Sequence, residues 1–369
     1  MNSAWEDNRW TALPHLMGPA RADACVIGLG GSGLAAIHAF LDQGLTVIGI
    51  DAAQVASGAA GANGGFLLAG SARFYHQVVN TIGRARAHAL YGRTLDEIER
   101  MGREMPDIVR RAGSLRIAAS EEERADCNVQ YETMTGDLLP VERYNGPEGQ
   151  GLLMPTDAVF NPLTRCRRLA HAALERGARL FEGTAADEIV TGAVRTPQGL
   201  VRCKRIVIAV DGKLATVCPQ LKDRVRTARL QMLGTAPTNE VTVTRAVYSR
   251  WGYEYWQQLE DGRVVLGGFR DHAMDDEWTD SVNVTPVIQN LLERFLRDKL
   301  HIQAPITHRW AASVGYTDNG LPIVEETRPG VWAVGGYNGT GNVMGALSAR
   351  AAVAAALGIA SEFLGLIRP

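Results

Sequence analysis

The chain has 369 residues, of which 46% are hydrophobic and 21% are charged, and its net charge is −2. These values are close to the globular average, so they exclude an intrinsically disordered chain, and the small net charge argues against a nucleic-acid partner. At roughly 100–200 residues per domain, the length predicts two domains. Glycine is unusually common, at 40 residues, and many of these glycines lie in clusters.

The five cysteines and the first 22 residues indicate the cellular compartment of the protein. The cysteines form no Cys-x-x-Cys pair, and the charged, tryptophan-containing start resembles neither a signal peptide nor a membrane span. We therefore expect a cytoplasmic protein with reduced thiols and no membrane partner. The acidic segment 271–277 has one His and no second His at a fitting spacing, so we expect no metal site.

The first part of the chain predicts one β-α-β unit. Asp23–Gly28 and Leu45–Ile50 are short apolar runs typical of buried parallel strands. Between them, Leu34–Gln43 has the spacing of a helix that ends at Gly44. The downstream predictions are one or two amphipathic helices in 76–113, a strand at 115–119 and a polar, irregular segment at 121–150.

The rest of the chain again predicts strands and helices, with Asn161-Pro162 as a helix start. The predicted elements are a helix at 163–176, a strand at 179–182, a hairpin at 188–203, a strand at 205–210, antiparallel strands within 225–270, a helix at 285–300, an extended segment at 306–325, a strand at 331–334 and a helix at 342–357.

This order predicts an α/β fold with a Rossmann-like dinucleotide-binding domain made of three pieces. A second domain with a mixed and largely antiparallel sheet is expected to bind the substrate. The predicted pieces are 23–75, 155–222 and 305–369 for the first domain, 76–154 and 223–304 for the second, and 1–22 for an irregular lead-in.

A glycine motif directly follows the first predicted strand. Gly28-Leu-Gly30-Gly31-Ser32-Gly33 matches Gly-x-Gly-x-x-Gly, opens a predicted helix, and is followed by Asp51 at the end of the next strand. Bare backbone lets a pyrophosphate approach the first N–H groups of the helix, and Asp51 can accept hydrogen bonds from a ribose 2′-OH. An acid at this position favours FAD or NAD over NADP.

A second glycine-rich segment follows Asp51-Ala52 and runs from Ser57-Gly58 to Asn63-Gly64-Gly65-Phe66. Its small side chains let backbone pass close to a flat ring, and Asn63 adds a donor and an acceptor for ring heteroatoms. We interpret it as a signal for FAD rather than NAD; a flexible surface loop is the alternative.

Five parts of the chain together resemble the D-amino-acid oxidase (DAO) family of FAD enzymes, most of all its gamma-glutamylputrescine oxidase and glycine oxidase branch. The resemblance extends from about residue 5 to about residue 350. Its segments are Asp23–Gly33, Asp51, Ser57–Gly65, Trp251–Arg270 and Gly335–Gly345.

This resemblance implies an FAD that runs from the glycine motif towards the Asn63–Phe66 loop. It also implies that the 182–185 segment backs the adenine. A helix start after Gly339 would lie at the pyrimidine end of the flavin, where a helix N-terminus stabilises negative charge. Asp211 departs from the Gly, Asn or Thr more usual after its strand. The residues expected at FAD are Gly28, Gly30, Gly31, Ser32, Gly33, Asp51, Ala52, Ser57, Gly58, Asn63, Gly64, Gly65, Phe66, Ala185, Gly339, Thr340, Gly341, Asn342 and Val343.

Three departures from the family bear on the reaction. The segment 310–317, where sarcosine oxidases attach their flavin to a Cys, has none, so we predict non-covalent FAD. The carboxylate-anchoring Arg and Lys of related enzymes are replaced near Val314 and at Val343 or Met344, which favours an amine over a simple α-amino acid. The strand 263–268 lacks the Lys that assists reaction with oxygen, so either O₂ is the electron acceptor and reacts slowly, or another molecule is the acceptor.

Several residues are candidates for the substrate pocket. Trp251, Tyr253 and Tyr255 alternate along a predicted strand and would share one face, where aromatic rings can stack on a cation; ordinary core aromatics are the alternative. Arg73, Arg229, Arg270 and Arg309 can supply a charge or belong to ion pairs. The selected pocket candidates are Tyr253, Tyr255, Tyr316, Tyr337, Arg73 and Arg270.

The sequence thus predicts an FAD-dependent oxidoreductase that oxidises the C–N bond of a small amine or amino-acid derivative. Hydride transfer to flavin would give an imine, with H₂O₂ as the other product if oxygen is the acceptor. This chemistry requires an aligned C–H bond and no protein base. The alternatives are a dehydrogenase with another acceptor, a flavin-binding redox sensor and, less in keeping with the C-terminal glycine segment, an NAD-dependent dehydrogenase.

Overall fold

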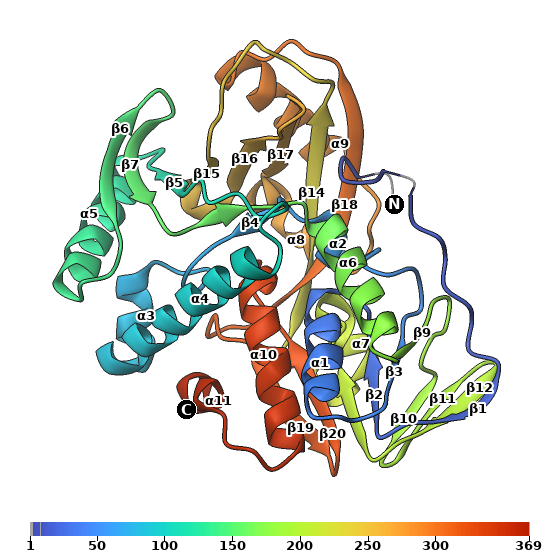
Figure 1. The fold of residues 1–369 in the computed structure, drawn as a ribbon. Coiled ribbons are helices and arrows are strands. Elements are labelled where there is room, and N and C mark those ends of the chain that lie inside the picture. Colours follow the sequence, from blue (N-terminus) through green and yellow to red (C-terminus); the bar gives the residue numbers. More distant parts are fainter. Residues whose placement is uncertain (1–2, 8, 369) are drawn as a thin grey trace. The chain divides into compact units, whose positions relative to one another are not determined.

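The computed structural model describes residues 3–7 and 9–368. The chain forms two compact units, and Figure 1 labels their elements. Unit 1 consists of Met1–Glu6, Ala62–Asn161 and Ala228–Ser313, and unit 2 consists of Asp7–Gly61, Pro162–Thr227 and Val314–Pro369. The bounds of the units differ from those of the predicted domains. Residues 62–75 and 155–161, which were predicted to belong to the dinucleotide-binding domain, fall in unit 1.

Unit 2 contains a six-stranded sheet in the order β19-β20-β13-β2-β3-β9. Every neighbouring pair is parallel except β19 with β20. Short runs of Val, Ile and Ala form its central strands because both faces of a parallel sheet are covered. The strands are β2 (Ala24–Ile27), β3 (Val47–Ile50), β9 (Arg179–Phe181), β13 (Arg205–Ile208), β19 (Ile323–Arg328) and β20 (Val331–Gly335).

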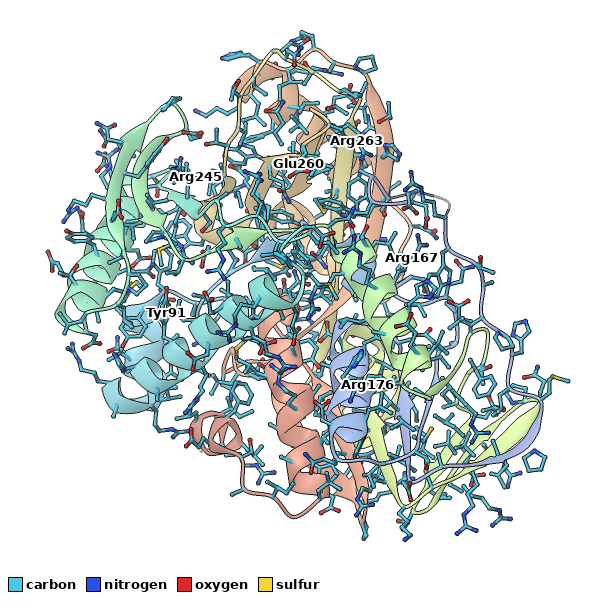
Figure 2. The ribbon with its side chains drawn as sticks, in the orientation of Figure 1. Tyr91, Arg167, Arg176, Arg245, Glu260 and Arg263 are labelled. Carbon is cyan, nitrogen blue, oxygen red and sulfur yellow. The ribbon has the colours of Figure 1, made fainter. Side chains whose placement is uncertain are left out.

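Three helices pack beside this sheet: α1 (Gly31–Asp42), α6 (Pro162–Glu175) and α10 (Gly341–Ala356), with α1 in contact with both others. Arg176, which follows α6 and is labelled in Figure 2, donates to the Asp42 carboxylate of α1 over 2.6 Å. The expectation of a Rossmann-like α/β arrangement is confirmed. Helix α1 begins three residues earlier than predicted, inside the glycine motif.

A second sheet of unit 2 corrects the prediction for the lead-in and for the hairpin. Its order is β1-β12-β11-β10, so the lead-in ends in a strand that pairs in parallel with β12. The first strand of the predicted hairpin, residues 188–194, is instead divided between β10 and β11. The backbone turns between them at Gly192, which has a φ of +84°. The strands are β1 (Gly18–Arg21), β10 (Glu188–Val190), β11 (Ala193–Thr196) and β12 (Gly199–Arg202).

Unit 1 is organised around an eight-stranded mixed sheet in the order β18-β14-β17-β16-β15-β5-β7-β6. The pairing is antiparallel except between β15 and β5 among the registers described. The strands are β5 (Ser114–Ile117), β6 (Glu142–Gly146), β7 (Gly149–Met154), β14 (Arg226–Thr235), β15 (Ala246–Ser249), β16 (Glu254–Gln258), β17 (Val264–Gly268) and β18 (Ile306–Tyr316). A separate two-stranded sheet pairs β4 (Phe66–Leu67) with β8 (Ala158–Val159).

The segment 121–150 contradicts its prediction as irregular, because it forms a helix and two strands. Ser120 caps helix α5 (Glu121–Gly136) by accepting a hydrogen bond from the Glu123 N–H. This Ser-x-x-Glu pattern is a helix start that the polar composition concealed. The other helices of unit 1 are α3 (Tyr75–Ile82), α4 (Arg84–Glu104), α8 (Met274–Glu277) and α9 (Pro286–Arg294), which continues as a π-helix over Phe295–Lys299.

The predicted aromatic strand at 251–259 also needs correction. Arg250, Trp251 and Gly252 all have left-handed φ values and form a turn, so β16 begins only at Glu254. Trp251 is 42% exposed on that turn. The proposed alternation of Trp251, Tyr253 and Tyr255 on one strand face is therefore wrong.

Hydrophobic cores lie within each unit. Ile27, Ile48, Ile206 and Ile208 belong to the core of unit 2, and α9 contributes Ile288 to that of unit 1. No helix among the described residues is long and apolar enough to cross a membrane. The remaining helices are α2 (Ala59–Ala62), α7 (Leu214–Val217) and α11 (Glu362–Ile367), and short 3-10 turns cover Asp211–Lys213, Pro219–Leu221, Arg250–Gly252 and Arg270–Ala273.

Candidate active site

The glycine turn of unit 2 has no space for a side chain at Gly28 or Gly33. Gly28 has a φ of +100°, and a Cβ there would lie 2.5 Å from the Ala209 carbonyl oxygen. A Cβ on Gly33 would lie 1.8 Å from the carbonyl oxygen of Gly28. Helix α1 starts here without an acidic residue in its first turn, so its first N–H groups and positive dipole end suit an anionic group.

Asp51 connects this turn to the end of β3. Its carboxylate accepts hydrogen bonds from the N–H groups of Leu29 (2.7 Å) and Ala53 (2.8 Å). Burial raises the pKa of Asp51 above its ordinary value, and these backbone donors oppose the shift. Asp51 therefore stabilises the glycine turn itself, a role that the motif does not reveal.

Glu182 is an anchor for this end of unit 2 that sequence reasoning missed. It is 2% exposed and accepts hydrogen bonds from the Trp10 Nε1–H and from the N–H groups of Leu13 and Val55, over 2.6–2.8 Å. The Thr184 N–H donates to the Asp51 carbonyl. These bonds attach the segment 182–185, and with it Ala185, to the end of β3; its predicted adenine contact stays a prediction.

The segment that contains Ala52, Ser57 and Gly58 folds back over the glycine turn. The Ala56 N–H donates to the Leu29 carbonyl over 3.1 Å. Gly61 packs so closely that a Cβ would lie 2.2 Å from the Ala56 carbonyl oxygen. Gly61 is thus required for close packing within unit 2, whereas a Cβ on Gly58 would meet nothing within 4 Å.

A second helix start lies beside the first in unit 2. Thr340 occupies the N-cap position of α10, and its N–H and hydroxyl donate to the Tyr337 carbonyl. A Cβ on Gly345 of α10 would lie 3.4 Å from the Cβ of Ser32 in α1. The first turn of α10 also has no acidic residue, so Gly339, Gly341 and Asn342 lie at a second positive helix end. Val343 is 1% exposed.

Two of the tyrosines proposed for the pocket lie near α10. The Tyr337 ring is 4% exposed and lies against Gly341 and Gly345, so it fills space next to the helix. Burial raises the pKa of Tyr337 well above its ordinary value. The Tyr316 hydroxyl lies beside Gly339, 3.7 Å from where a Cβ would be.

In unit 1, the segment Asn63–Phe66 is a turn held in place by hydrogen bonds. The Asn63 side-chain oxygen accepts from the Gly65 N–H (2.9 Å), and the Asn63 carbonyl accepts from the Trp5 indole N–H (2.8 Å). Gly65 has a φ of +74°. Gln257 of β16 donates its side-chain N–H to the carbonyl oxygens of Gly64 and Gly65. The loop is thereby fixed to the sheet.

Three aromatic rings lie next to this turn. Phe66, Tyr248 and Tyr255, which we call the aromatic trio, have ring-centroid separations of 5.3, 5.8 and 6.2 Å. Tyr248 lies opposite Tyr255 in the ladder, and on the next strand Tyr255 lies opposite Gly267, whose missing side chain leaves room for its ring. Tyr248 is the member that sequence reasoning missed, because its partnership depends on strand register.

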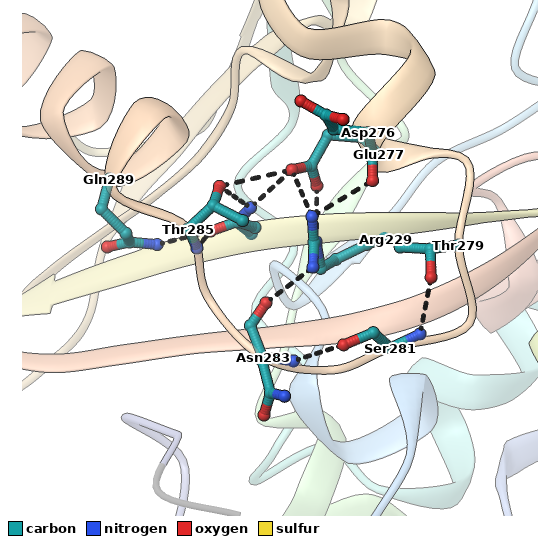
Figure 3. Close-up of polar contacts among 9 residues, drawn as sticks. Arg229, Asp276, Glu277, Thr279, Ser281, Asn283, Thr285 and Gln289 are labelled. Atoms are coloured by element: carbon teal, nitrogen blue, oxygen red, sulfur yellow. Dashed lines mark hydrogen bonds and ion pairs between the residues drawn. The ribbon is translucent and has the colours of Figure 1, made fainter.

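The candidate arginines have different environments. Arg229 is buried and forms an ion pair with the buried Glu277 over 2.8 Å (Figure 3). Arg309 pairs with Glu293. The Arg270 guanidinium lies over the rings of Tyr253 and Trp278, 5.7 and 4.7 Å from their centroids. Arg73 is exposed on the loop before α3.

This geometry fits a bound dinucleotide. The two helix starts can receive negative charge, and the glycine cradle leaves backbone bare where a Cβ would collide. Within unit 2, these features lie after β2, β3 and β20, at the carboxyl edge where parallel-sheet proteins bind such ligands.

Comparisons with known proteins agree with this arrangement. A Rhizobium meliloti protein described as "Probable oxidoreductase OrdL" is 27% identical, over 95% of this chain and 86% of its own length. The gamma-glutamylputrescine oxidoreductase of Escherichia coli is 25% identical, over 90% and 83%. Glycine oxidase from Geobacillus kaustophilus has the same fold, with a TM-score of 0.75, 19% identity, and coverage of 93% of this chain and 96% of its own.

Residues 23–355 match the family model described as FAD dependent oxidoreductase (DAO). Bound FAD supplies a hydride acceptor for such an enzyme. The chain therefore belongs to the DAO family and is an FAD-dependent oxidoreductase.

Proposed function

We propose that this enzyme oxidises the C–N bond of a small amine or an amino-acid derivative, at a carbon that carries no carboxylate. The supporting observation is that Val314, Val343 and Met344, at the positions expected to anchor a carboxylate, are apolar and 8%, 1% and 1% exposed. Arg229 and Arg309 are already paired with acidic residues. The gamma-glutamylputrescine oxidoreductase among the relatives is named for a substrate that contains an amine.

In this proposal, the glycine turn and the two helix starts of unit 2 would bind the phosphates and ribose of FAD, and unit 1 would bind the substrate. The backbone N–H groups at the starts of α1 and α10 would hold negative charge of the cofactor, and Asp51 would hold its ribose. The aromatic trio excludes water and can stack on the alkyl chain of the substrate or on a cationic nitrogen. Bound FAD would accept the hydride from the α-carbon of the neutral amine, and water would hydrolyse the resulting imine. No protein base is required in this step.

An anaerobic bleaching assay tests the substrate class. The purified holoenzyme is mixed with gamma-glutamylputrescine, other primary and secondary amines, glycine or L-proline, and loss of the visible flavin band is followed. We expect amines to bleach the flavin faster than the two α-amino acids. Fast bleaching by glycine or L-proline alone would contradict the proposal.

A dehydrogenase is the second candidate function, because the β17 strand has buried apolar residues where the resemblance expects a Lys. Val264, Val265 and Leu266 are each 0% exposed. The rates of H₂O₂ formation in air and of dye reduction under nitrogen separate the two. A dehydrogenase will reduce the dye much faster than oxygen, whereas comparable rates will identify an oxidase.

A further inference from the structure

The turn that leads into α10 is held by the buried carboxylate of Asp211, which follows β13. One Asp211 oxygen accepts hydrogen bonds from the N–H groups of Gly336 (2.9 Å) and Tyr337 (3.3 Å). The other accepts from the N–H of Gly315 in β18 (3.1 Å). A single side chain thus connects the ends of β13, β20 and β18.

The surroundings are built around this carboxylate. A Cβ on Gly315 would lie 3.0 Å from an Asp211 oxygen, and one on Gly335 would lie 3.2 Å from the Asp211 Cα. Asp211 itself has a φ of +36°, a strained value for a residue other than glycine. Such strain persists where the surrounding structure holds it, as three hydrogen bonds do here.

The turn also requires support, because Gly336, Asn338 and Gly339 all have left-handed φ values. Asn338 supplies a second connection: its side-chain N–H donates to the Gly336 carbonyl over 2.7 Å, and its side-chain oxygen accepts from the Thr317 N–H over 2.9 Å. The turn then passes directly to Thr340 and the start of α10.

We propose that Asp211 is a positioning residue for FAD: its ionised carboxylate holds the 336–340 turn so that the N-terminus of α10 points at the cofactor. This inference rests on the proposed placement of FAD at α10. An ionised carboxylate can accept from all three N–H groups, whereas an amide presents an NH2 donor in place of one oxygen, and a protonated acid is a weaker acceptor because it has lost its negative charge. Loss of one of these bonds leaves a buried backbone N–H unsatisfied and loosens the turn.

Asp211 also makes the turn sensitive to pH. Burial raises the pKa of Asp211 to about 6, while the Gly315, Gly336 and Tyr337 N–H groups oppose the shift. The titratable neighbour on the turn is Tyr337, whose pKa is far too high for it to ionise in this range. Gly315 from β18 and Leu214 from α7 contribute no charge. If the ionised form alone binds FAD well, the dissociation constant should rise roughly fourfold at pH 5.5.

The test measures the FAD dissociation constant of the apoprotein by fluorescence quenching, between pH 7.5 and 5.5. Asp211→Asn is compared with Asp157→Asn, which alters a buried carboxylate of unit 1 that also accepts a backbone N–H and also has a pKa of about 6. At pH 7.5, we expect Asp211→Asn to weaken FAD binding about tenfold and to abolish the pH dependence. Asp157→Asn should leave both unchanged.

Each other outcome has a separate meaning. If the wild-type apoprotein fails to bind FAD, the proposed placement of the cofactor fails. If the wild type binds FAD and Asp211→Asn binds it equally well, or if Asp157→Asn weakens binding to the same extent, Asp211 is not a positioning residue. If Asp211→Asn does not fold, the wild-type pH profile decides alone: a flat profile overturns the inference.

Discussion

At the scale of single residues, the glycine motif shows how a sequence pattern becomes a physical requirement. Gly33 faces the Gly28 carbonyl at a separation that no Cβ tolerates. Its place in the motif was readable from the sequence because the requirement is local, involving a strand end and the helix that follows it. The sequence also predicted Asp51 as the acid that follows a strand. It did not predict that the N–H groups of Leu29 and Ala53 donate to its carboxylate.

Substitution of Gly33 tests the cradle. Gly33→Ala should abolish FAD binding or prevent folding of unit 2, because its Cβ would lie 1.8 Å from a backbone oxygen. Gly365→Ala is the control in the same unit: it lies within α11, where a Cβ meets nothing within 4 Å. The control should be neutral or stabilising by up to about 1 kcal/mol. Thermal unfolding and FAD titration measure both effects, and normal FAD binding by Gly33→Ala would refute the assignment.

Because the Asp157 carboxyl is buried, we expect the free energy of unfolding to fall as the pH rises and this group ionises. It accepts hydrogen bonds from the Ser114 hydroxyl (2.6 Å) and the Ala69 N–H (2.8 Å), yet burial raises its pKa from 3.8 to about 6. A carboxyl whose folded-state pKa is raised adds stability that is present below pH 3.8 and is lost as the pH rises through 6.

Between about pH 4 and pH 7, the wild type should therefore lose about 2 kcal/mol more stability than Asp157→Asn, which cannot titrate there. Urea denaturation of both proteins across this range provides the measurement. Parallel stability profiles for the two proteins would show that Asp157 does not titrate as described.

At the scale of elements, a buried network holds the loop 278–285 against β14. The Arg229 side chain donates to both Glu277 oxygens and to the carbonyls of Asp276 and Asn283, and Gln231 donates to Glu277 and to the Thr285 hydroxyl (Figure 3). The pair therefore serves unit 1 as a connection between sheet and loop. This explains why Arg229 is not a substrate anchor in our proposal.

Breaking this pair should be costly. Arg229→Met leaves Glu277 buried and unpaired and should destabilise the protein by about 3–5 kcal/mol. Removing both charges in Arg229→Met/Glu277→Met should restore much of that loss. As a control, Arg195→Ala removes an exposed pair with Glu188 and should change little. Chemical denaturation measures all three variants, and equal stabilities for the single and double variants would exclude a desolvated ion pair.

The errors at this scale have identifiable causes. Helix α5 was missed because its polar sequence has little amphipathic pattern, although Ser120 and Glu123 mark its start. Strand β16 was extended too far because a left-handed turn at Arg250–Gly252 is invisible in an aromatic-rich stretch. In both places, residue composition does not distinguish the predicted structure from the observed one. Local contacts determine whether the segment is helical or irregular in the first case, and a strand or a turn in the second.

At the scale of the whole molecule, we expect FAD to be bound non-covalently, and acid precipitation of the holoenzyme tests this expectation. All five cysteines are buried and free, and the segment 310–317 contains none. After acid precipitation, the yellow colour of the holoenzyme should therefore move to the supernatant. Colour that stays in the pellet would reveal a covalent link through another residue.

The family and cofactor were predictable because short, contiguous motifs encode them: the glycine turn, the acid after β3 and the glycine segment before α10. The match over residues 23–355 confirms that reading. The substrate was not predictable to the same extent, because side chains from distant strands determine which groups are available.

The sequence alone thus determined the α/β class, the strand-turn-helix of the dinucleotide motif and the family, since each depends on residues close together in the chain. Only the tertiary structure decided that Tyr248 joins Tyr255, that Arg229 belongs to Glu277 and that Asp211 connects three strand ends. The partners of Arg229 and Asp211 lie far away along the chain, and the pairing of Tyr248 with Tyr255 depends on how two consecutive strands align. These partnerships depend on strand register and burial, which no local pattern specifies.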